Sequence, residues 1–392
     1  MLTPADEAHL AAIVADAAAK KTPLAIAGGG TRSGLGRPTQ TATTVSTLLL
    51  SGVTLYEPSE LVLSARAGTP LRDIEALLGT NRQRLAFEPM DHRGIYGSAG
   101  VPTIGAVAAA NLSGPRRIQV GAARDHLIGL RAVTGTGAVI KAGGRVMKNV
   151  AGYDLVKFLA GSLGTLAVLS EVTFKVQPAP ETEATLALTG LSDASAVAAM
   201  TTALGSPFSV SGATHAPAAD SEPARTYFRL EGFEPSVAYR TDQLRDALLD
   251  FGVADVLGAS TSASLWLTVL DIDRLSAPLS TPIWRISVPP SDGPNVVAAA
   301  ESAFPVRVLY DWGGGLVWIA GGEGPDAGAA VIRAAVRIAG GHATLIRAPD
   351  DVRQATEVFE PLAPPLMELT RKLKATFDPA GILNPGRMYA GV

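Results

Sequence analysis

The 392-residue sequence contains no cysteine. This absence excludes disulfide bonds, thiolate metal sites, iron–sulfur ligation and any cofactor attached through a cysteine. Redox chemistry, if the chain takes part in it, must therefore belong to a bound cofactor. Charge is also scarce, because 18% of the residues are charged and the net charge at pH 7 is −3. Nucleic-acid binders usually carry a concentrated basic surface, so this class of function is set aside.

The sequence also lacks recognisable targeting, membrane and metal-binding patterns. Its first residues, MLTPADEAHL, have no basic region followed by an apolar one, so no secretory signal is predicted and a cytoplasmic protein is expected. A long uncharged stretch, residues 94–115, is interrupted by glycine, proline, serine and asparagine, which indicates loops packed on a ligand rather than a transmembrane helix. The five histidines do not pair at metal-ligand spacing, so no metal site is predicted.

The chain is long enough, and has enough apolar residues, to form about two domains. Hydrophobic residues make up 47% of the sequence. Residues 1–180 combine strand-like, helical and glycine-rich segments, which predicts an α+β domain. The segment PAPETEAT, residues 178–185, breaks the apolar pattern and marks a boundary. Residues 181–365 predict a smaller cap of the α/β or α+β class, and residues 366–392 predict a helix followed by turns.

Two segments carry clear local signals. Thr3 and Pro4 are suited to the N-cap and the first position of a helix, and the apolar spacing that follows predicts a helix ending near Lys20. In the cap, the segment ASLWLTVL at residues 263–270 is rich in residues that favour strands, so we predict a strand there.

The most informative segment is LAIAGGGTRSGLGRP, residues 24–38. A P-loop would need a lysine at the end of the glycine loop, and no lysine lies between Lys21 and Lys141. The Rossmann fingerprint needs a different glycine spacing and an acid about 20 residues later, whereas the first acid is Glu57. Two interpretations remain open: a surface turn, or a loop of successive backbone N–H groups that wraps a pyrophosphate.

Further motifs follow in a set order and favour the second interpretation. They are TIGAVAAANLSGPRR, VGAARDHLIGL, KNVAGYDLVKFLAGSLGTLAVLSEVTFKVQP and FDPAGILNPGRM. Together with GGGTRSGLG, this order resembles the FAD-binding proteins of the vanillyl-alcohol oxidase type, also called PCMH-type. The resemblance implies an FAD-binding domain of two subdomains over residues 1–180, a cap over 181–365, and a C-terminal segment, 366–392, that returns to the flavin.

The resemblance also implies where the cofactor is held. The positions that match the motifs of the family are Gly28, Gly29, Gly30, Thr31, Arg32, Ser33, Gly34, Pro102, Thr103, Gly105, Asn111, Ser113, Gly114, Arg117, Gly121, Arg124, Asp125, Gly164, Val168, Asn384 and Arg387. Several relatives attach the flavin to a histidine just after the loop glycines. Here that position holds a threonine, so noncovalent FAD is predicted.

Within the family, the motifs are most similar to those of the FAD-binding subunits of glycolate-oxidising complexes. This implies an accessory or electron-transfer flavoprotein, with a second flavoprotein holding the substrate site and an iron–sulfur subunit removing electrons. The complex would be cytoplasmic, or held at the inner membrane through its partners. Two alternatives stay open: a self-sufficient FAD-dependent 2-hydroxy-acid dehydrogenase, and a non-catalytic scaffold with structural FAD. His342 and Arg347 are the catalytic candidates, although a structural role for a lone histidine at a strand start is favoured.

Overall fold

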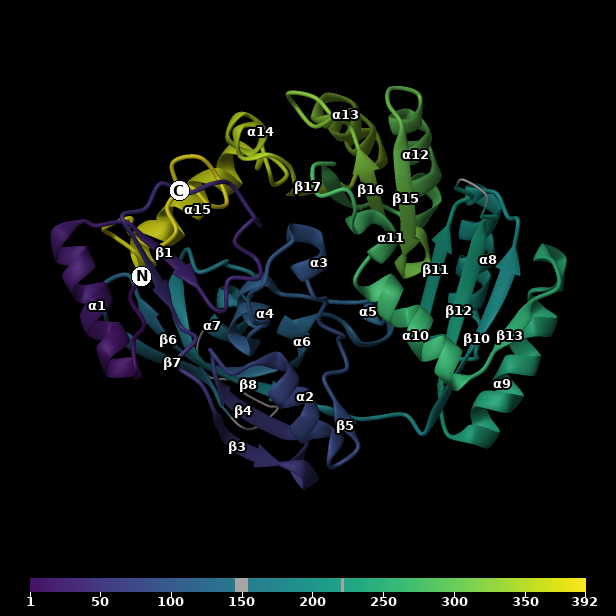
Figure 1. The fold of residues 1–392 in the computed structure, drawn as a ribbon, viewed down its shortest axis with the longest axis horizontal. Helices are drawn as coiled ribbons and strands as arrows, with labels where there is room; N and C mark the ends of the chain where they lie inside the picture. The colour runs from purple at the N-terminus through teal and green to yellow at the C-terminus, as the bar shows by residue number, and fades with distance from the viewer. Residues whose placement is uncertain (145–153, 220–221) are drawn as a thin grey trace. The chain divides into compact units, whose positions relative to one another are not determined.

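The computed structural model describes residues 1–144, 154–219 and 222–392. The chain divides into two compact units, each coloured along the chain in Figure 1. Unit 1 contains Met1–Ser113, Gly121–Ala179 and Pro361–Val392, and unit 2 contains Gly114–Val120 and Pro180–Glu360. The first part of the KNVAGYDL motif, residues 148–153, lies outside the described residues.

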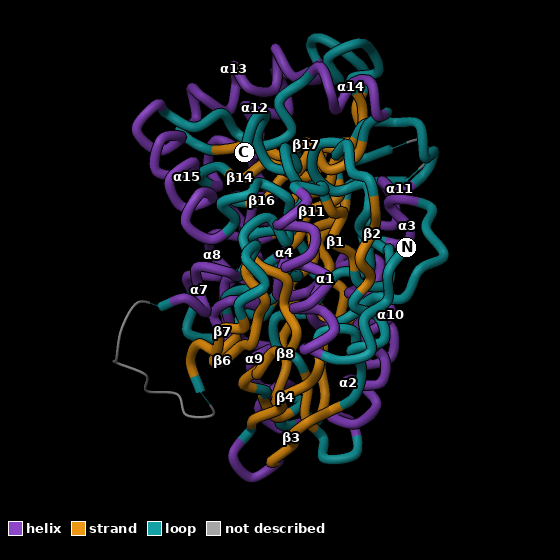
Figure 2. The backbone as a smooth tube through the Cα atoms, turned by 90° about the vertical axis from the view of Figure 1, so that its left-hand side faces the viewer, coloured by secondary structure: helices purple, strands orange, loops and turns teal. Residues whose placement is uncertain are grey.

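Unit 1 is built on a five-stranded antiparallel sheet with a separate parallel strand pair. Across the sheet the strands are β3 (Val53–Glu57), β4 (Val62–Arg66), β8 (Ala167–Lys175), β6 (Leu127–Thr134) and β7 (Val139–Gly143), drawn in orange in Figure 2. The parallel pair is β1 (Leu24–Ala27) with β2 (Thr43–Ser46). Helices α2 (Leu71–Gly79) and α4 (Ile104–Ala110) bury their apolar sides in one core with β4, β6 and β8.

Helix α1 starts later than the sequence predicts. It spans Glu7–Lys20, and its N-cap is Asp6, whose carboxylate accepts a hydrogen bond of 2.7 Å from His9 N. Thr3 and Pro4 therefore lie before the helix, and that part of the prediction is wrong. A carboxylate at the N-cap satisfies a backbone N–H and also adds a negative charge where the helix dipole is positive, so it caps better than the threonine.

Unit 2 is built on an eight-stranded sheet in which every pairing is antiparallel. In order across the sheet the strands are β13 (Asp255–Leu257), β10 (Thr182–Thr189), β12 (Arg225–Gly232), β11 (Gly212–Ala216), β15 (Val306–Asp311), β16 (Leu316–Gly321), β14 (Ile283–Ser287) and β17 (His342–Arg347). Of the two classes that the sequence left open for the cap, the structure has α+β.

Four helices of unit 2 share one core with this sheet. They are α8 (Asp193–Gly205), α9 (Glu234–Ala247), α12 (Gly293–Glu301) and α13 (Ala329–Ala339). Strand β10 shows how the two faces separate. Leu186 and Leu188 lie in the core with these helices, while the hydroxyl of Thr185, which points to the opposite face, accepts a hydrogen bond of 2.9 Å from Trp266 Nε1 of α10 (Ala259–Leu270).

The strand predicted at residues 263–270 is wrong, because these residues belong to helix α10. Its buried residues are Ser262, Trp266 and Val269, which recur at the spacing of one helix face. The residue types favour strands, but their spacing lets a helix bury Trp266 against β10, and packing overrides the local preference.

Residues 114–120 also differ from their expected place. The sequence pattern predicts them in the flavin domain, whereas they cluster with the sheet of unit 2. Trp312 Nε1 donates a hydrogen bond of 3.0 Å to Gly114 O, and Arg116 Nε lies 3.5 Å from Glu231 Oε2 with both side chains buried. A buried charge pair and a buried indole hold this segment, and neither could be paired from the sequence.

The C-terminal segment is tied to unit 1 by a buried ion pair after helix α15 (Pro364–Phe377). Asp378 is 1% exposed, lies 2.8 Å from Lys374 Nζ, and accepts hydrogen bonds from Ile382 N and Leu383 N at 3.1 and 2.8 Å. Lys374 Nζ also donates to Thr165 O and Leu383 O at 2.7 Å each. One carboxylate therefore satisfies two backbone N–H groups and a buried ammonium.

Replacing this carboxylate should destabilise unit 1. We expect Asp378→Ala to lower the free energy of unfolding by about 3–5 kcal/mol, because it leaves a buried ammonium without its counter-charge. The matched control is Glu368→Ala, which removes an exposed partner of Lys372 and should cost less than about 1 kcal/mol. The denaturant midpoints of both variants and the parent test this, and equal midpoints for the two variants would contradict it.

Candidate functional site

The glycine loop of residues 28–34 is held in place through its carbonyl groups. Strand β1 runs into it beside β2, and Thr47 N donates to Ala27 O at 2.8 Å. Ser46 Oγ donates to Gly28 O at 2.9 Å, and Val101 N donates to Gly29 O at 3.1 Å. Protein donors thus satisfy the carbonyl oxygens at the start of the loop, and these hydrogen bonds fix the path of its backbone.

The donor side of the same loop is different. Among the described residues, the backbone N–H groups from Gly30 to Ser33 find no protein acceptor. Gly30 has φ +82°, and a Cβ added there would meet no atom within 4 Å. Successive unpaired N–H groups beside open space form an anion-binding concavity, which is the geometry that a pyrophosphate requires.

The two preceding glycines are needed for close packing. A Cβ on Gly29 would lie 2.0 Å from Val101 O, and a Cβ on Gly28 would lie 2.3 Å from Thr103 Oγ1. The hydroxyl of Thr103 is completely buried and has no hydrogen-bond partner. The segment at residues 101–103 can therefore approach the loop only because these positions lack a side chain.

Arg32 brings a positive charge to the loop. Its Nη2 donates to Met90 O at 3.2 Å and its Nε to His92 Nδ1 at 3.3 Å, while its buried Nη1 has no partner. Burial lowers the pKa of Arg32 to about 10, which leaves the guanidinium charged at neutral pH. The carboxylate of Asp91 partly offsets this charge, but the buried Nη1 donor is still unused, and a phosphate oxygen fits it.

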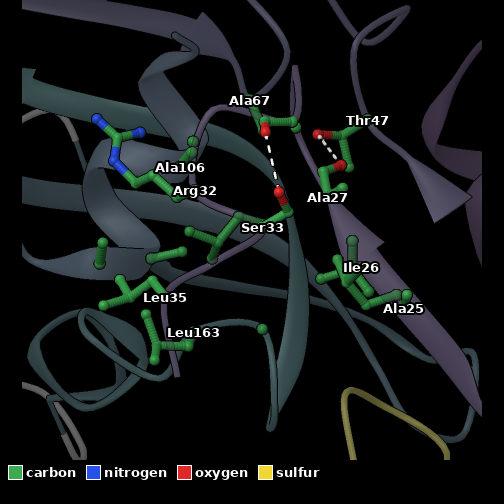
Figure 3. A pocket seen from close by; sticks show the side chains of 18 of the residues that line it. Ala25, Ile26, Ala27, Arg32, Ser33, Leu35, Thr47, Ala67, Ala106 and Leu163 are labelled. Carbon is green, nitrogen blue, oxygen red and sulfur yellow. Dashed lines mark hydrogen bonds between the residues drawn. The ribbon is translucent and has the colours of Figure 1, made fainter. Parts of the chain in front are cut away.

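The loop opens into a cavity within unit 1 that is lined mainly by small and apolar side chains (Figure 3). Its walls come from β1, α4, the turn at Leu163 and Gly164, and the start of β8. The lining residues that sequence reasoning did not single out include Ala25, Ile26, Ala27, Leu35, Thr47, Ala67, Ala106, Ala109, Ala110, Leu163 and Ala167. Alanines let a flat ligand lie close to the backbone. The run AVAAAN gave a signal for part of this wall, but Ala67, at the end of β4, looks like an ordinary core residue.

Asn384 joins the two ends of the chain at this cavity. Its side chain is buried, its Oδ1 accepts a hydrogen bond of 2.8 Å from Ile26 N, and its Nδ2 donates to Leu163 O at 2.8 Å. Both polar atoms of the amide are thus used to hold β1 against the 163–164 turn. Arg387 Nη2 donates to Arg32 O at 3.0 Å, and Arg387 itself lines the cavity.

The structure brings about half of the predicted cofactor residues together. Those that line the cavity are Gly28, Gly29, Gly30, Thr31, Arg32, Ser33, Gly105, Gly164, Val168 and Arg387. Gly34, Pro102, Thr103 and Asn384 adjoin it through the contacts of the loop, the 101–103 segment and β1. Those that lie in unit 1 without lining it are Asn111, Ser113, Gly121, Arg124 and Asp125.

The residues outside the cavity have local partners. Asn111 Oδ1 accepts a hydrogen bond of 3.0 Å from Arg124 N, and Asp125 Oδ2 accepts one of 2.8 Å from Ala122 N. Gly114 and Arg117 belong to unit 2. A direct contact of these residues with the cofactor stays a prediction.

The two catalytic candidates lie on β17 of unit 2. Arg347 is 5% exposed and donates to three carbonyl oxygens, those of Thr281, Ser276 and Pro278, at 2.9, 2.5 and 2.9 Å. It anchors a loop and is built into the fold. His342 lies at the start of β17, where partial loss of surrounding water and the charge of Arg285 lower its pKa.

Among residues 1–144, 154–219 and 222–392, no group of three or more histidine or acidic side chains could hold a metal ion. None of the helices described is both long and apolar enough to cross a membrane.

Comparison with known proteins gives two family matches and a full-length relative. Residues 1–143 match the FAD binding domain family, and residues 352–388 match the C-terminal domain of FAD linked oxidases. Glycolate oxidase subunit GlcE of Escherichia coli (strain K12) is 36% identical over 96% of this chain and 95% of its own length. Glycolate oxidase subunit GlcD of Bacillus subtilis (strain 168) is 43% identical over 23% of this chain and 19% of its own.

Among solved structures, 4-ethylphenol oxidase from Gulosibacter chungangensis, in complex with isoeugenol, has a TM-score of 0.72. It matches 99% of this chain and 88% of its own at 14% identity, so it shows a shared fold. The predicted fold class and the predicted FAD-binding family are confirmed by these matches.

A charge placed in the loop should remove the cofactor. We expect Gly30→Asp to abolish FAD retention, because a carboxylate would occupy the open space beside the unpaired N–H groups and repel pyrophosphate. The matched control is Gly190→Asp in unit 2, since Gly190 also has a positive φ, +79°, and open space around it. Flavin content per chain after purification is the measurement, and full flavin content in Gly30→Asp would contradict the assignment.

Proposed function

The chain belongs to the glycolate oxidase subunit GlcE family of FAD-linked oxidoreductases, and on this premise we propose that it is the FAD-carrying accessory subunit of a glycolate-oxidising complex. One observation supports the accessory role above the others. The described lining of the unit 1 cavity contains two arginines and no histidine, lysine, tyrosine or acid. It offers positive charge for binding an anion and no group that could accept a proton from a substrate.

We assign FAD binding to the loop and the cavity. The N–H groups from Gly30 to Ser33 and the unused Nη1 of Arg32 would hold the pyrophosphate, and the alanine-rich walls would contact the rest of the dinucleotide. Thr31 is 2% exposed and has no imidazole ring for a histidyl–flavin bond, and the chain has no cysteine, so we assign the cofactor as noncovalent. When bound, FAD accepts an electron pair and passes the electrons on.

Oxidation of a hydroxy acid needs a base for the hydroxyl proton, a cation for the carboxylate and a hydride acceptor. The two arginines that line the cavity each donate to a backbone carbonyl, Arg32 to Met90 O and Arg387 to Arg32 O. The proposal therefore places the base in another subunit. That partner is a second flavoprotein of the GlcD type, and an iron–sulfur subunit removes the electrons. The complex works in the cytoplasm, with any membrane association made by the partners.

Two alternatives make different predictions. A self-sufficient 2-hydroxy-acid dehydrogenase would reduce its own flavin with substrate. A scaffold with structural FAD would hold the complex together, and loss of its flavin would leave electron flow through the partner unchanged.

Anaerobic mixing of the purified, FAD-loaded chain with glycolate tests the proposal. We expect the oxidised flavin absorbance to persist with glycolate, D-lactate and L-lactate and to disappear with dithionite. In the complex with its flavoprotein partner, glycolate should bleach the flavin of both chains. Bleaching of the single chain by glycolate would overturn the accessory role in favour of the self-sufficient enzyme.

A further inference from the structure

The eight-stranded sheet of unit 2 has two outer edges with different surroundings. Strand β17 forms one edge, and its outward N–H groups are bonded. Ala343 N donates to Glu360 Oε2 at 3.0 Å. Leu345 N donates to Val358 O at 2.8 Å. Strand β13 forms the other edge (Figure 1) and pairs on one side with β10. A covered edge cannot accept a further strand, so β13 is the edge at which this sheet can be extended.

The backbone on the outer side of β13 has no partner among the described residues. Residues 255–257 pair with residues 185–187 of β10, and the N–H and C=O groups along an antiparallel strand point alternately toward the neighbour and away from it. At least one residue of β13 therefore presents both groups outward. With the residues that the structure describes, the backbone of residues 253–257 forms hydrogen bonds with β10 alone. Such an edge is a template for one more strand, so its natural ligand is an extended polypeptide.

The side chains beside this edge are apolar and exposed. The exposed fractions are 57% for Leu249, 84% for Val253 and 47% for Val256. Val256 is opposite Leu186 in the strand register and shares with it the helical face of the sheet. Leu249 and Val253 precede β13 in the chain, and Leu249 begins the 3₁₀ helix η2 (Leu249–Phe251). Apolar side chains next to an unpaired edge lose contact with water when a strand is added, which stabilises the pairing.

The charges around the edge are of one sign. Residues 246–257 contain three aspartates, Asp246, Asp250 and Asp255, and no lysine or arginine. All three aspartates are exposed, and none forms an ion pair with a described residue. Asp255 points to the face of the sheet opposite that of Val256, because the two residues are consecutive in the strand. An added strand therefore fits best with an apolar side chain beside Val256 and a lysine or arginine beside Asp255.

The same charges disfavour two other occupants of the edge. A second copy of the chain, paired about a two-fold axis at Val256, would place the two Asp255 carboxylates diagonally opposite each other on one face, where like charges repel. An anionic membrane surface would be repelled by the three aspartates. The edge is therefore complementary to a different chain that carries a basic, extended segment.

We propose that the outer edge of β13 binds an extended segment of the second flavoprotein subunit, in which an apolar residue and a lysine or arginine are neighbours in sequence. The segment adds one further strand to the unit 2 sheet. Its backbone bonds to β13, its apolar side chain packs beside Val256, and its basic side chain pairs with Asp255. The choice of the flavoprotein as the partner rests on the proposed function, whereas the basic, extended character of the segment rests on the edge itself.

Binding of the FAD-loaded chain to the purified flavoprotein subunit, measured by biolayer interferometry without glycolate, tests the proposal. Val256→Lys and Asp255→Lys should each weaken binding about 10- to 100-fold, because the first places a charge in the apolar contact and the second repels the basic side chain. Asp255→Asn should weaken binding less than Asp255→Lys, and it remains informative if the lysine variants fold poorly. Rising salt concentration should weaken binding by the parent more than binding by Asp255→Asn.

The matched controls carry the same kinds of change elsewhere in unit 2. Ile338→Lys alters an apolar residue of α13 that is 90% exposed, and Glu301→Lys reverses an exposed acid at the end of α12. Both should bind the flavoprotein subunit as the parent does. Thermal unfolding and flavin content are recorded for every variant, so that loss of folding or of FAD is separated from loss of the partner.

Hydrogen exchange identifies the strand pairing itself, since a contact between side chains alone would not protect backbone amides. Amide exchange at residues 255–257 should slow when the flavoprotein subunit is bound. Unchanged affinity in both lysine variants, or no protection of β13 in the complex, would overturn the proposal. So would a parent chain that does not bind the flavoprotein, or one whose β13 is protected by the iron–sulfur subunit or by self-association instead. Bleaching of the isolated chain by glycolate would overturn the accessory role and leave these binding results unaffected, so the two failures are distinguishable.

Discussion

The cofactor site depends on how one short loop divides its backbone hydrogen bonds. The carbonyl oxygens of Ala27, Gly28 and Gly29 accept from protein donors, while the N–H groups from Gly30 to Ser33 find no acceptor in the described structure. A loop fixed on one side and unsatisfied on the other is already arranged for an anion, so little ordering has to accompany binding. The glycines serve both sides, since two allow the close approach of residues 101–103 and Gly30 supplies the positive φ.

The rest of unit 1 keeps this loop in position. Asn384 uses both ends of its amide to hold β1 against the 163–164 turn, and Asp378 and Lys374 fix the segment that carries Asn384. The C-terminal segment therefore completes the site without supplying a reactive group. The two cavity arginines also hold the backbone in place, because Arg32 donates to Met90 O and Arg387 donates to Arg32 O. The Nη1 group of Arg32 has no partner and can donate to an anion.

The two faces of the unit 2 sheet differ because successive side chains along a strand point to opposite faces. One face of the sheet is apolar and covered by four helices, and the other face carries Arg285 on an indole platform. Where this second face is covered, buried polar groups are paired, as between Trp266 and Thr185. Arg285 on this face contacts the rings of Trp312 and Trp318.

The sequence by itself determined the family, the cofactor and the glycine loop, because these depend on backbone requirements that only certain residues meet in a certain order. It also determined most helices and strands, since their apolar periodicity is local. Only the tertiary structure decided the rest. Asp6 rather than Thr3 caps α1. The two candidate caps differ in free energy by about the strength of one hydrogen bond, which is too little for the sequence pattern to separate them. Residues 263–270 are helical because Trp266 packs against β10. Ala67 lies in the cavity wall, residues 114–120 cluster with the unit 2 sheet, and Arg285 contacts Trp312. Each of these contacts joins residues far apart in the chain, so no local sequence pattern predicts them.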